Sequence, residues 1–158
     1  MGGNRECFAS RFPFCFSEKG VIVMEIYDNI CKIDEQCFKN PWTWEAMVFE
    51  ISHPLSVSVL EWRDGMVAAF AVGRVIADEA EVMKIATLEK YRRQGIARVM
   101  MNELLDKMRE RGAVTCYLEA ASRNAAALGL YKSLGFEEIF VRKLYYGDDD
   151  AISMRLTL

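Results

Sequence analysis

Hydrophobic residues recur along this chain at two spacings, and each spacing predicts a different kind of element. Alternation with a period of two, or a short unbroken apolar run, is typical of strands. The strands predicted in this way span residues 55–62, 67–76, 80–88 and 113–120. The dipeptide Asp64-Gly65, which favours a tight hairpin turn, joins the first two, and Asp78-Glu79 turns into the third. The middle of the chain is therefore expected to form an antiparallel meander.

Helical spacing marks the segments on either side of this meander and after it. The strongest signal is an apolar residue at every fourth position, namely Ile96, Met100, Leu104 and Met108, before a stop at Gly112. The other predicted helices begin at the N-cap residues Asp28, Thr43 and Asn124 and span residues 28–38, 43–52 and 124–134. Each of these helices carries an apolar stripe that must pack against another element.

The two ends of the chain complete the predicted order. Residues 21–26, "VIVMEI", read as a short strand, and residues 137–158 read as two strands around a solvated acidic turn at 147–150. The resulting order, β-α-α-β-β-β-α-β-α-β-β, predicts an α/β fold in which a mixed sheet carries helices on both faces. Residues 21–158 are expected to form a single domain, and residues 1–20 an appended, poorly ordered leader.

The composition argues against several functional classes. The net charge is −3, so the strongly basic footprint of a nucleic-acid-binding protein is missing. The five cysteines include no C-x-x-C pair and there is one histidine, which argues against a disulfide framework and a metal site. No apolar run reaches the roughly 18 residues of a membrane span. We therefore expect a cytoplasmic protein in a reducing compartment, with no metal, nucleic-acid or membrane partner.

Positive charge and a glycine are concentrated where the longest predicted helix begins, in "YRRQG" at residues 91–95. A helix N-terminus offers unpaired N–H groups and a partial positive charge to an anion. Gly95 would let such a ligand approach the backbone, and Arg92 and Arg93 would add charged donors. We interpret the segment as a diphosphate site. The alternative is an ordinary turn with solvated arginines, and the segment has neither the P-loop nor the dinucleotide-binding pattern.

Taken together, these segments resemble the GNAT superfamily of N-acetyltransferases from about residue 21 to the C-terminus. Residues 92–97 are similar to the acetyl-CoA diphosphate loop of that superfamily, R-x-x-G-x-G/A, with Ala97 where glycine is commoner. Within the superfamily the resemblance is closest to the RimI-type N-terminal acetyltransferases. The residues that carry this closer resemblance are Pro41-Trp42-Thr43, Leu118-Glu119, Asn124, Ala127, Leu130-Tyr131, Leu134-Gly135-Phe136 and the segment 145–154.

The resemblance implies a site for acetyl-CoA, used as the acetyl donor, and no metal. In such enzymes the strand before the diphosphate loop splays away from its neighbour, and its backbone holds the pantetheine arm. The implied coenzyme-binding residues are Ile85, Ala86 and Thr87 on that strand, Arg92, Arg93, Gln94, Gly95, Ile96 and Ala97 in the loop, and Asn124 and Tyr131 on the facing helix.

The resemblance also implies the catalytic residues. Glu119 ends a predicted strand, which is where open α/β sheets bind ligands, and it matches the general base, acting directly or through a water. Tyr131 matches the general acid that protonates the leaving sulfur. Trp42, Tyr145 and Tyr146 would frame the acceptor. From the residues alone, Glu119 could also be a solvated strand end, Tyr131 a core aromatic, and the other three simple hydrophobic packing.

The implied reaction is direct acetyl transfer, in a ternary complex, to the α-amine of a protein or peptide N-terminus. The closer resemblance suggests the N-terminal alanine of ribosomal protein S18 as the acceptor. About one sixth of an α-amine is neutral at pH 7, against ~0.04% of a lysine side chain, so an N-terminus needs a base less urgently. The alternatives are an enzyme for lysine side chains, polyamines or an amino-sugar drug, and an acyl-CoA-binding module without turnover.

Overall fold

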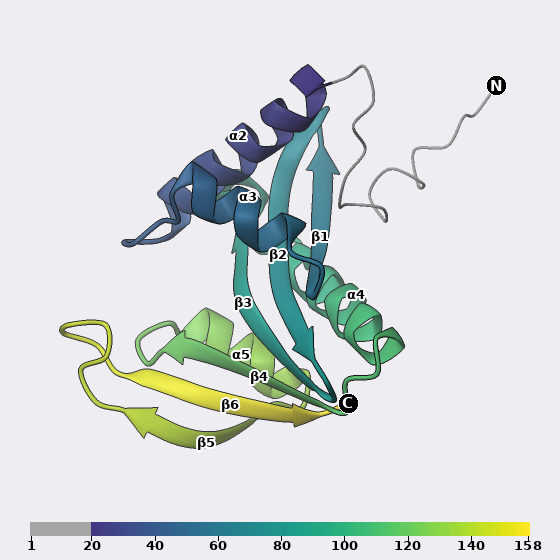
Figure 1. Cartoon of the computed structure of the whole chain (residues 1–158). Coiled ribbons are helices and arrows are strands. Elements are labelled where there is room, and N and C mark those ends of the chain that lie inside the picture. The colour runs from purple at the N-terminus through teal and green to yellow at the C-terminus, as the bar shows by residue number, and fades with distance from the viewer. Residues whose placement is uncertain (1–19) are drawn as a thin grey trace.

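The computed structural model describes residues 20–158 (Figure 1). The predicted leader, residues 1–20, therefore lies outside the described residues apart from Gly20. The elements follow the order α2 (Gly20–Cys37), α3 (Trp44–Ser52), β1 (Ser56–Arg63), β2 (Met66–Ile76), β3 (Glu79–Thr87), η1 (Glu89–Tyr91), α4 (Ile96–Glu110), β4 (Thr115–Ala121), α5 (Ala125–Ser133), β5 (Glu137–Arg142) and β6 (Ala151–Thr157). None of the helices within this part of the chain is long and apolar enough to cross a membrane.

The strands form one six-stranded sheet in the order β1-β2-β3-β4-β6-β5. Every neighbouring pair is antiparallel except β3 and β4, which are parallel. This parallel pair is short, because only Glu79–Val82 lies opposite Thr115–Leu118. Beyond that point the two strands diverge, and β1–β3 separates from β4, β6 and β5 as two arms (Figure 1). The predicted mixed sheet is confirmed.

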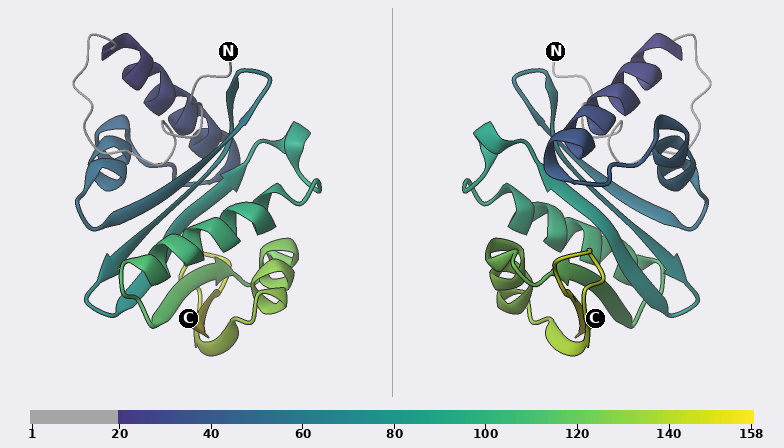
Figure 2. Two further views of the ribbon diagram at one scale, coloured as in Figure 1. Left: turned by 90° about the vertical axis from the view of Figure 1, so that its right-hand side faces the viewer. Right: turned by 90° about the vertical axis from the view of Figure 1, so that its left-hand side faces the viewer.

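Helices cover both faces of the sheet, as the sequence predicted. Figure 2 shows α2 and α3 on one side of the central strands and α4 on the other. The core under α4 contains Met100, Leu104 and Met108, all at most 1% exposed, which is the stripe predicted from the spacing of four. The opposite core is built around Phe70 of β2 and Met47 of α3, both fully buried. The central strands β2 and β3 are thus held between two apolar layers.

The predicted strand at residues 21–26 is wrong, because this segment belongs to the long helix α2. Ile26, Ile30 and Ile33 are at most 5% exposed and follow helical spacing, so they form one stripe that packs against the sheet. A short β-branched run has strand propensity by itself, but burial of a longer amphipathic stripe outweighs this local preference. Asp28 is consequently no N-cap; it lies within the helix and accepts a hydrogen bond from Trp44 Nε1 at 3.1 Å.

The N-cap predicted at Thr43 and the predicted hairpin turn are confirmed. Thr43 Oγ1 accepts from the backbone N–H of Ala46 at 3.2 Å and starts α3. Asp64 and Gly65 both have positive φ, 52° and 79°, which is the backbone of a type I′ hairpin turn. The turn into β3 lies one residue earlier than predicted, since Glu79 is already the first residue of that strand. Local hydrogen bonding and backbone conformation therefore set these two element ends.

Candidate active site

The divergence of β3 from β4 leaves one edge of β3 without a neighbouring strand. Ile85, Ala86 and Thr87 pair with β2 on their other side, through Ala71, Phe70 and Ala69. Their pairing with β4 has ended at Val82. An unpaired strand edge presents main-chain N–H and C=O groups to an extended ligand. This is the geometry expected of the predicted pantetheine segment.

Thr87 adds a buried polar atom to this edge. Its side chain is 9% exposed, and its hydroxyl has no hydrogen-bond partner within the part of the chain that the structure describes. A buried hydroxyl without a partner costs free energy, and a bound polar ligand could satisfy it. The residues at the end of β3 therefore fit the amide-bearing arm that the sequence predicted there.

The loop after β3 ends in a helix N-terminus that no side chain caps. Gly95 is the N-cap of α4, with φ of 79° and no side-chain hydrogen bond. The first N–H groups of a helix have no acceptor within the helix, and here they belong to Ile96 and Ala97. Arg93 lies just before them, exposed, with φ of 61°. Free N–H donors and the positive charge of Arg93 thus lie together at the exposed start of α4, which is the arrangement that binds an anion.

The side chains of Arg92 and Gln94 are used within the protein. Arg92 Nε donates to the carbonyl oxygen of Thr87 at 3.0 Å, and its NH2 group lies 3.4 Å from Cys37 Sγ at the end of α2. Gln94 Nε2 donates to the carbonyl of Lys90 at 3.3 Å. Arg92 thus attaches the loop to the end of β3 and to the end of α2, and Gln94 attaches it to the preceding turn η1. Their contact with a diphosphate stays a prediction, with Arg93 the less constrained of the two arginines.

We expect Gly95→Ala to weaken coenzyme binding. Alanine with a positive φ costs about 1–2 kcal/mol, and the added methyl group would stand where the diphosphate approaches. The matched control is Gly112→Ala at the far end of α4, because Gly112 has φ of 90° and, like Gly95, open space around its missing Cβ. Calorimetry should show similar losses of stability for the two variants and a higher Kd for coenzyme A in the first alone. Equal affinities would contradict the predicted diphosphate site.

Glu119 lies on β4 beside an open pocket of about 340 Å³. Ser153 Oγ donates a hydrogen bond to Glu119 Oε1 at 2.9 Å. Arg142 NH1 lies 3.4 Å from the same oxygen. Among residues 20–158, no hydrogen bond is formed with the other oxygen, Oε2. The pocket is lined by Glu81, Tyr117, Leu118, Glu119, Ile139, Arg142, Tyr145, Ser153 and Met154. One carboxylate oxygen is therefore fixed while the second stays available to a ligand.

Neither Ser153 nor Arg142 was predicted as a site residue from the sequence. Ser153 lies opposite Glu119 because β4 and β6 pair in that register, across 34 residues of chain. Arg142 ends β5, the next strand beyond β6. Ser153 lies within the segment 145–154 that carries the closer resemblance, but nothing in the sequence paired it or Arg142 with Glu119, because strand register depends on the packing of the whole sheet.

Tyr131 lies on α5 and is 6% exposed. Burial raises the pKa of its hydroxyl to about 12, and the nearby Tyr146 contributes to the increase. Its ring packs edge-to-face on Phe136, with centroids 6.0 Å apart. The pKa of Tyr146 is raised by burial and further by the negative charge of Glu119. Tyr146 therefore interacts electrostatically with both predicted catalytic residues, Glu119 and Tyr131.

Asn124, the remaining residue predicted on the facing helix, is the N-cap of α5. Its Oδ1 accepts from the backbone N–H of Ala127 at 3.1 Å, so this oxygen is already used. The side-chain amide nitrogen is left as the group that could contact a ligand. The cap prediction is confirmed, and the pantetheine contact stays a prediction.

The three residues predicted to frame the acceptor lie in two places. Tyr145 lines the Glu119 pocket, contacts Tyr146 edge-to-face at 5.1 Å between centroids, and has the Arg142 guanidinium 4.9 Å from its ring. Trp42 lies instead in the loop between α2 and α3, where its ring faces Lys84. The structure therefore brings the two tyrosines to Glu119 and leaves Trp42 on another element.

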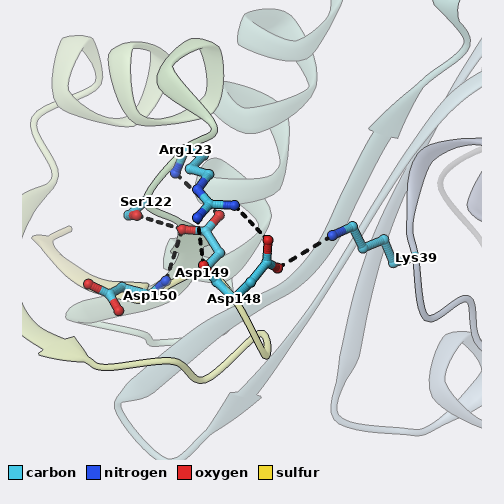
Figure 3. A network of polar contacts seen from close by, with 6 residues as sticks. All are labelled: Lys39, Ser122, Arg123, Asp148, Asp149 and Asp150. Atoms are coloured by element: carbon cyan, nitrogen blue, oxygen red, sulfur yellow. Dashed lines mark hydrogen bonds and ion pairs between the residues drawn. The ribbon is translucent and has the colours of Figure 1, made fainter.

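The acidic turn that follows the tyrosines is a paired network (Figure 3). Asp148 binds Arg123 at 2.7 Å and lies 3.7 Å from Lys39, which comes from the loop between α2 and α3. Ser122 donates to Asp149 at 2.6 Å. The hydrogen bond from Arg123 is the main cause that lowers the pKa of Asp148. The turn was predicted to be merely solvated; it is exposed, but its carboxylates are bound within the protein.

Comparison with known proteins identifies the family to which this chain belongs. The model of the acetyltransferase (GNAT) family matches residues 26–136. The chain belongs to the GNAT family. It is therefore an N-acetyltransferase, as the resemblance implied. Among residues 20–158, no group of three or more His, Cys, Asp or Glu side chains is arranged so that it could hold a metal ion.

Two bacterial GNAT relatives carry the same name. The "[ribosomal protein bS18]-alanine N-acetyltransferase" of Escherichia coli K12 is 43% identical over 100 residues, covering 61% of this chain and 68% of that protein. The Salmonella typhimurium protein of that name is 36% identical over 131 residues, covering 80% of this chain and 88% of its own. The crystal structure of the Escherichia coli enzyme superposes with a TM-score of 0.77 at 33% identity, covering 83% of this chain and 86% of that one. The predicted RimI-type relationship is confirmed.

Proposed function

We propose that this enzyme transfers the acetyl group of acetyl-CoA to the α-amine of a protein N-terminus, and that the acceptor is the N-terminal alanine of ribosomal protein S18. The names of the two enterobacterial relatives support this acceptor. The structural observation that carries the proposal is the carboxylate of Glu119, which is fixed by Ser153 on one oxygen and open to a pocket. The expected compartment is the cytoplasm.

The coenzyme would be held by the free edge of β3 and by the start of α4. Thr87, with its unpartnered hydroxyl, fits the polar arm, and the uncapped N–H groups after Gly95 fit the diphosphate. Acetyl-CoA supplies the acyl group as a thioester, whose sulfur is the leaving group. The chain's own residues must then accept one proton from the amine and stabilise the departing sulfur.

In the proposed reaction, Glu119 would accept the proton of the attacking amine. Its Oε1 is held by Ser153 and Arg142, so Oε2 is the oxygen that would accept that proton, directly or through one water. As the amine nitrogen bonds to the acyl carbon, the carbon–sulfur bond breaks. A carboxylate in an open pocket is a modest base, and this suits an α-amine better than a lysine, because the α-amine is already about one sixth neutral at pH 7.

In the proposed reaction, Tyr131 would stabilise the departing sulfur. With a pKa of about 12 its hydroxyl stays protonated at every physiological pH. A thiolate whose thiol has a pKa near ~8.5 cannot remove that proton completely. Tyr131 would therefore donate a strong hydrogen bond while the sulfur leaves, and would not give up its proton fully as the predicted general acid would. The proton that finally neutralises the thiolate would come from the amine, through Glu119 or solvent.

A panel of acceptors tests the proposal. The enzyme is incubated with acetyl-CoA and three acceptors: a peptide with the S18 N-terminus, the same peptide with a blocked α-amine and an internal lysine, and a polyamine. Mass spectrometry should find one acetyl group on the free α-amine and little on the others. Transfer confined to lysine or polyamine would support the second candidate, a lysine or small-molecule acetyltransferase. Saturable acetyl-CoA binding without any transfer would favour a non-catalytic module.

A further inference from the structure

A charged pair is buried on the side of the sheet that α2 covers. Asp34 of α2 is fully buried, and Lys84 of β3 is 9% exposed. Lys84 Nζ donates to both carboxylate oxygens of Asp34, at 2.7 Å and 2.6 Å. A lysine side chain is rarely buried unless it is paired. The predicted coenzyme segment, Ile85 to Thr87, begins at the next residue of the same strand.

This pair also fixes the loop between α2 and α3, residues 38–43, which we call the acceptor-side loop. The backbone N–H of Trp42 donates to Asp34 Oδ2 at 2.6 Å. The rings of Phe38 and Trp42 lie over Lys84 Nζ, at 4.4 Å and 4.6 Å from their centroids. Both ends of the loop are thus attached to one buried charge pair.

The acceptor-side loop contacts the late hairpin, and the hairpin contributes to the pocket of Glu119. Lys39, at the tip of the loop, reaches toward Asp148 of the turn that follows Tyr145 and Tyr146 (Figure 3). Tyr145 in turn lines the pocket. The exposed contact between Lys39 and Asp148 can hold the loop only weakly, because ion pairs in water are worth little. The position of the loop must therefore depend on its buried attachment.

A buried ion pair such as Asp34–Lys84 adds little net stability to a core. Removing two charges from water can cost as much as their attraction returns, and well-packed apolar residues often serve equally well or better. What apolar residues cannot supply is the directed hydrogen bond to the Trp42 N–H. We propose that Asp34 and Lys84 are positioning residues, which hold the acceptor-side loop and its Trp42 where the acceptor binds. This inference rests on the proposed amine acceptor.

Two double variants separate positioning from stability. D34L/K84M replaces the pair by apolar residues and removes the acceptor of the Trp42 N–H. D34N/K84M also removes both charges but keeps one carbonyl oxygen at that place. We expect D34L/K84M to raise KM for the acceptor peptide roughly 10–100-fold, while KM for acetyl-CoA changes less than about twofold. D34N/K84M should recover most of the loss. Equal acceptor KM values in wild type and D34L/K84M would overturn the proposal.

A measurement on the wild-type protein needs neither a folded variant nor a known acceptor. Hydrogen exchange of single backbone amides, followed by NMR, should show Trp42 exchanging roughly 10–100-fold more slowly than Asn40 of the same loop. Comparable exchange at the two residues would mean that the pair does not hold the loop, and would also overturn the proposal. If Trp42 is protected but no peptide α-amine is acetylated, the proposed acceptor fails while the positioning role stands.

Discussion

Glu119→Gln is expected to lower kcat by roughly 10²–10⁴-fold, the usual contribution of a general base. Glutamine keeps the size of the side chain and can still accept the hydrogen bond that Ser153 donates, so the strand pairing of β4 and β6 should persist. It cannot accept a proton from the attacking amine. Single-turnover kinetics with the S18 peptide measure the loss, and calorimetry should show unchanged binding of coenzyme A.

The matched control is Glu81→Gln, because Glu81 is the other carboxylate that lines the same pocket. It lies on β3 and has no role in the proposed reaction, so this variant should keep at least about a third of the wild-type rate. A large loss in Glu81→Gln with little loss in Glu119→Gln would move the base to β3. Comparable small losses in both would remove carboxylate catalysis from the proposal.

Tyr131→Phe is expected to lower kcat by about 10²-fold or more, since the variant loses the hydrogen bond to the departing sulfur. The edge-to-face packing on Phe136 survives in the variant, so the core should stay intact. Tyr117→Phe is the matched control, because Tyr117 lines the pocket of Glu119 and has no role in the proposed reaction. An equal loss in the two variants would contradict the assignment of Tyr131.

The high pKa of Tyr131 gives this prediction a pH dependence. Because its hydroxyl ionises only near pH 12, the rate should show no decline from this residue up to about pH 10. Its folded pKa lies above the ordinary value of 10, so the neutral form favours folding, and this contribution is present below pH 10 and lost as the pH rises toward 12. Denaturant titrations should therefore find that wild type loses about 2 kcal/mol more than Tyr131→Phe across this interval.

Patterns within a few residues of each other determined much of this structure. The spacing of four in α4, the caps at Thr43 and Asn124, and the turn at Asp64-Gly65 were all read correctly from the sequence. These features depend on hydrogen bonds and apolar faces that neighbouring residues form themselves. For the same reason the uncapped start of α4 at Gly95 could be recognised as a candidate anion site.

Only the tertiary structure decided the features that join distant segments. Residues 21–26 became helix because a long apolar stripe packs on the sheet, although the local run favours a strand. Ser153 meets Glu119 across 34 positions, and Lys84 meets Asp34 across 50, through strand register and helix docking. Strand register and helix docking are set by the free energy of the whole core, so no local sequence pattern could predict them. Local patterns in the chain thus specified most of its elements and its family, while the helix at residues 21–26 and the partners of Glu119 and Lys84 came from packing.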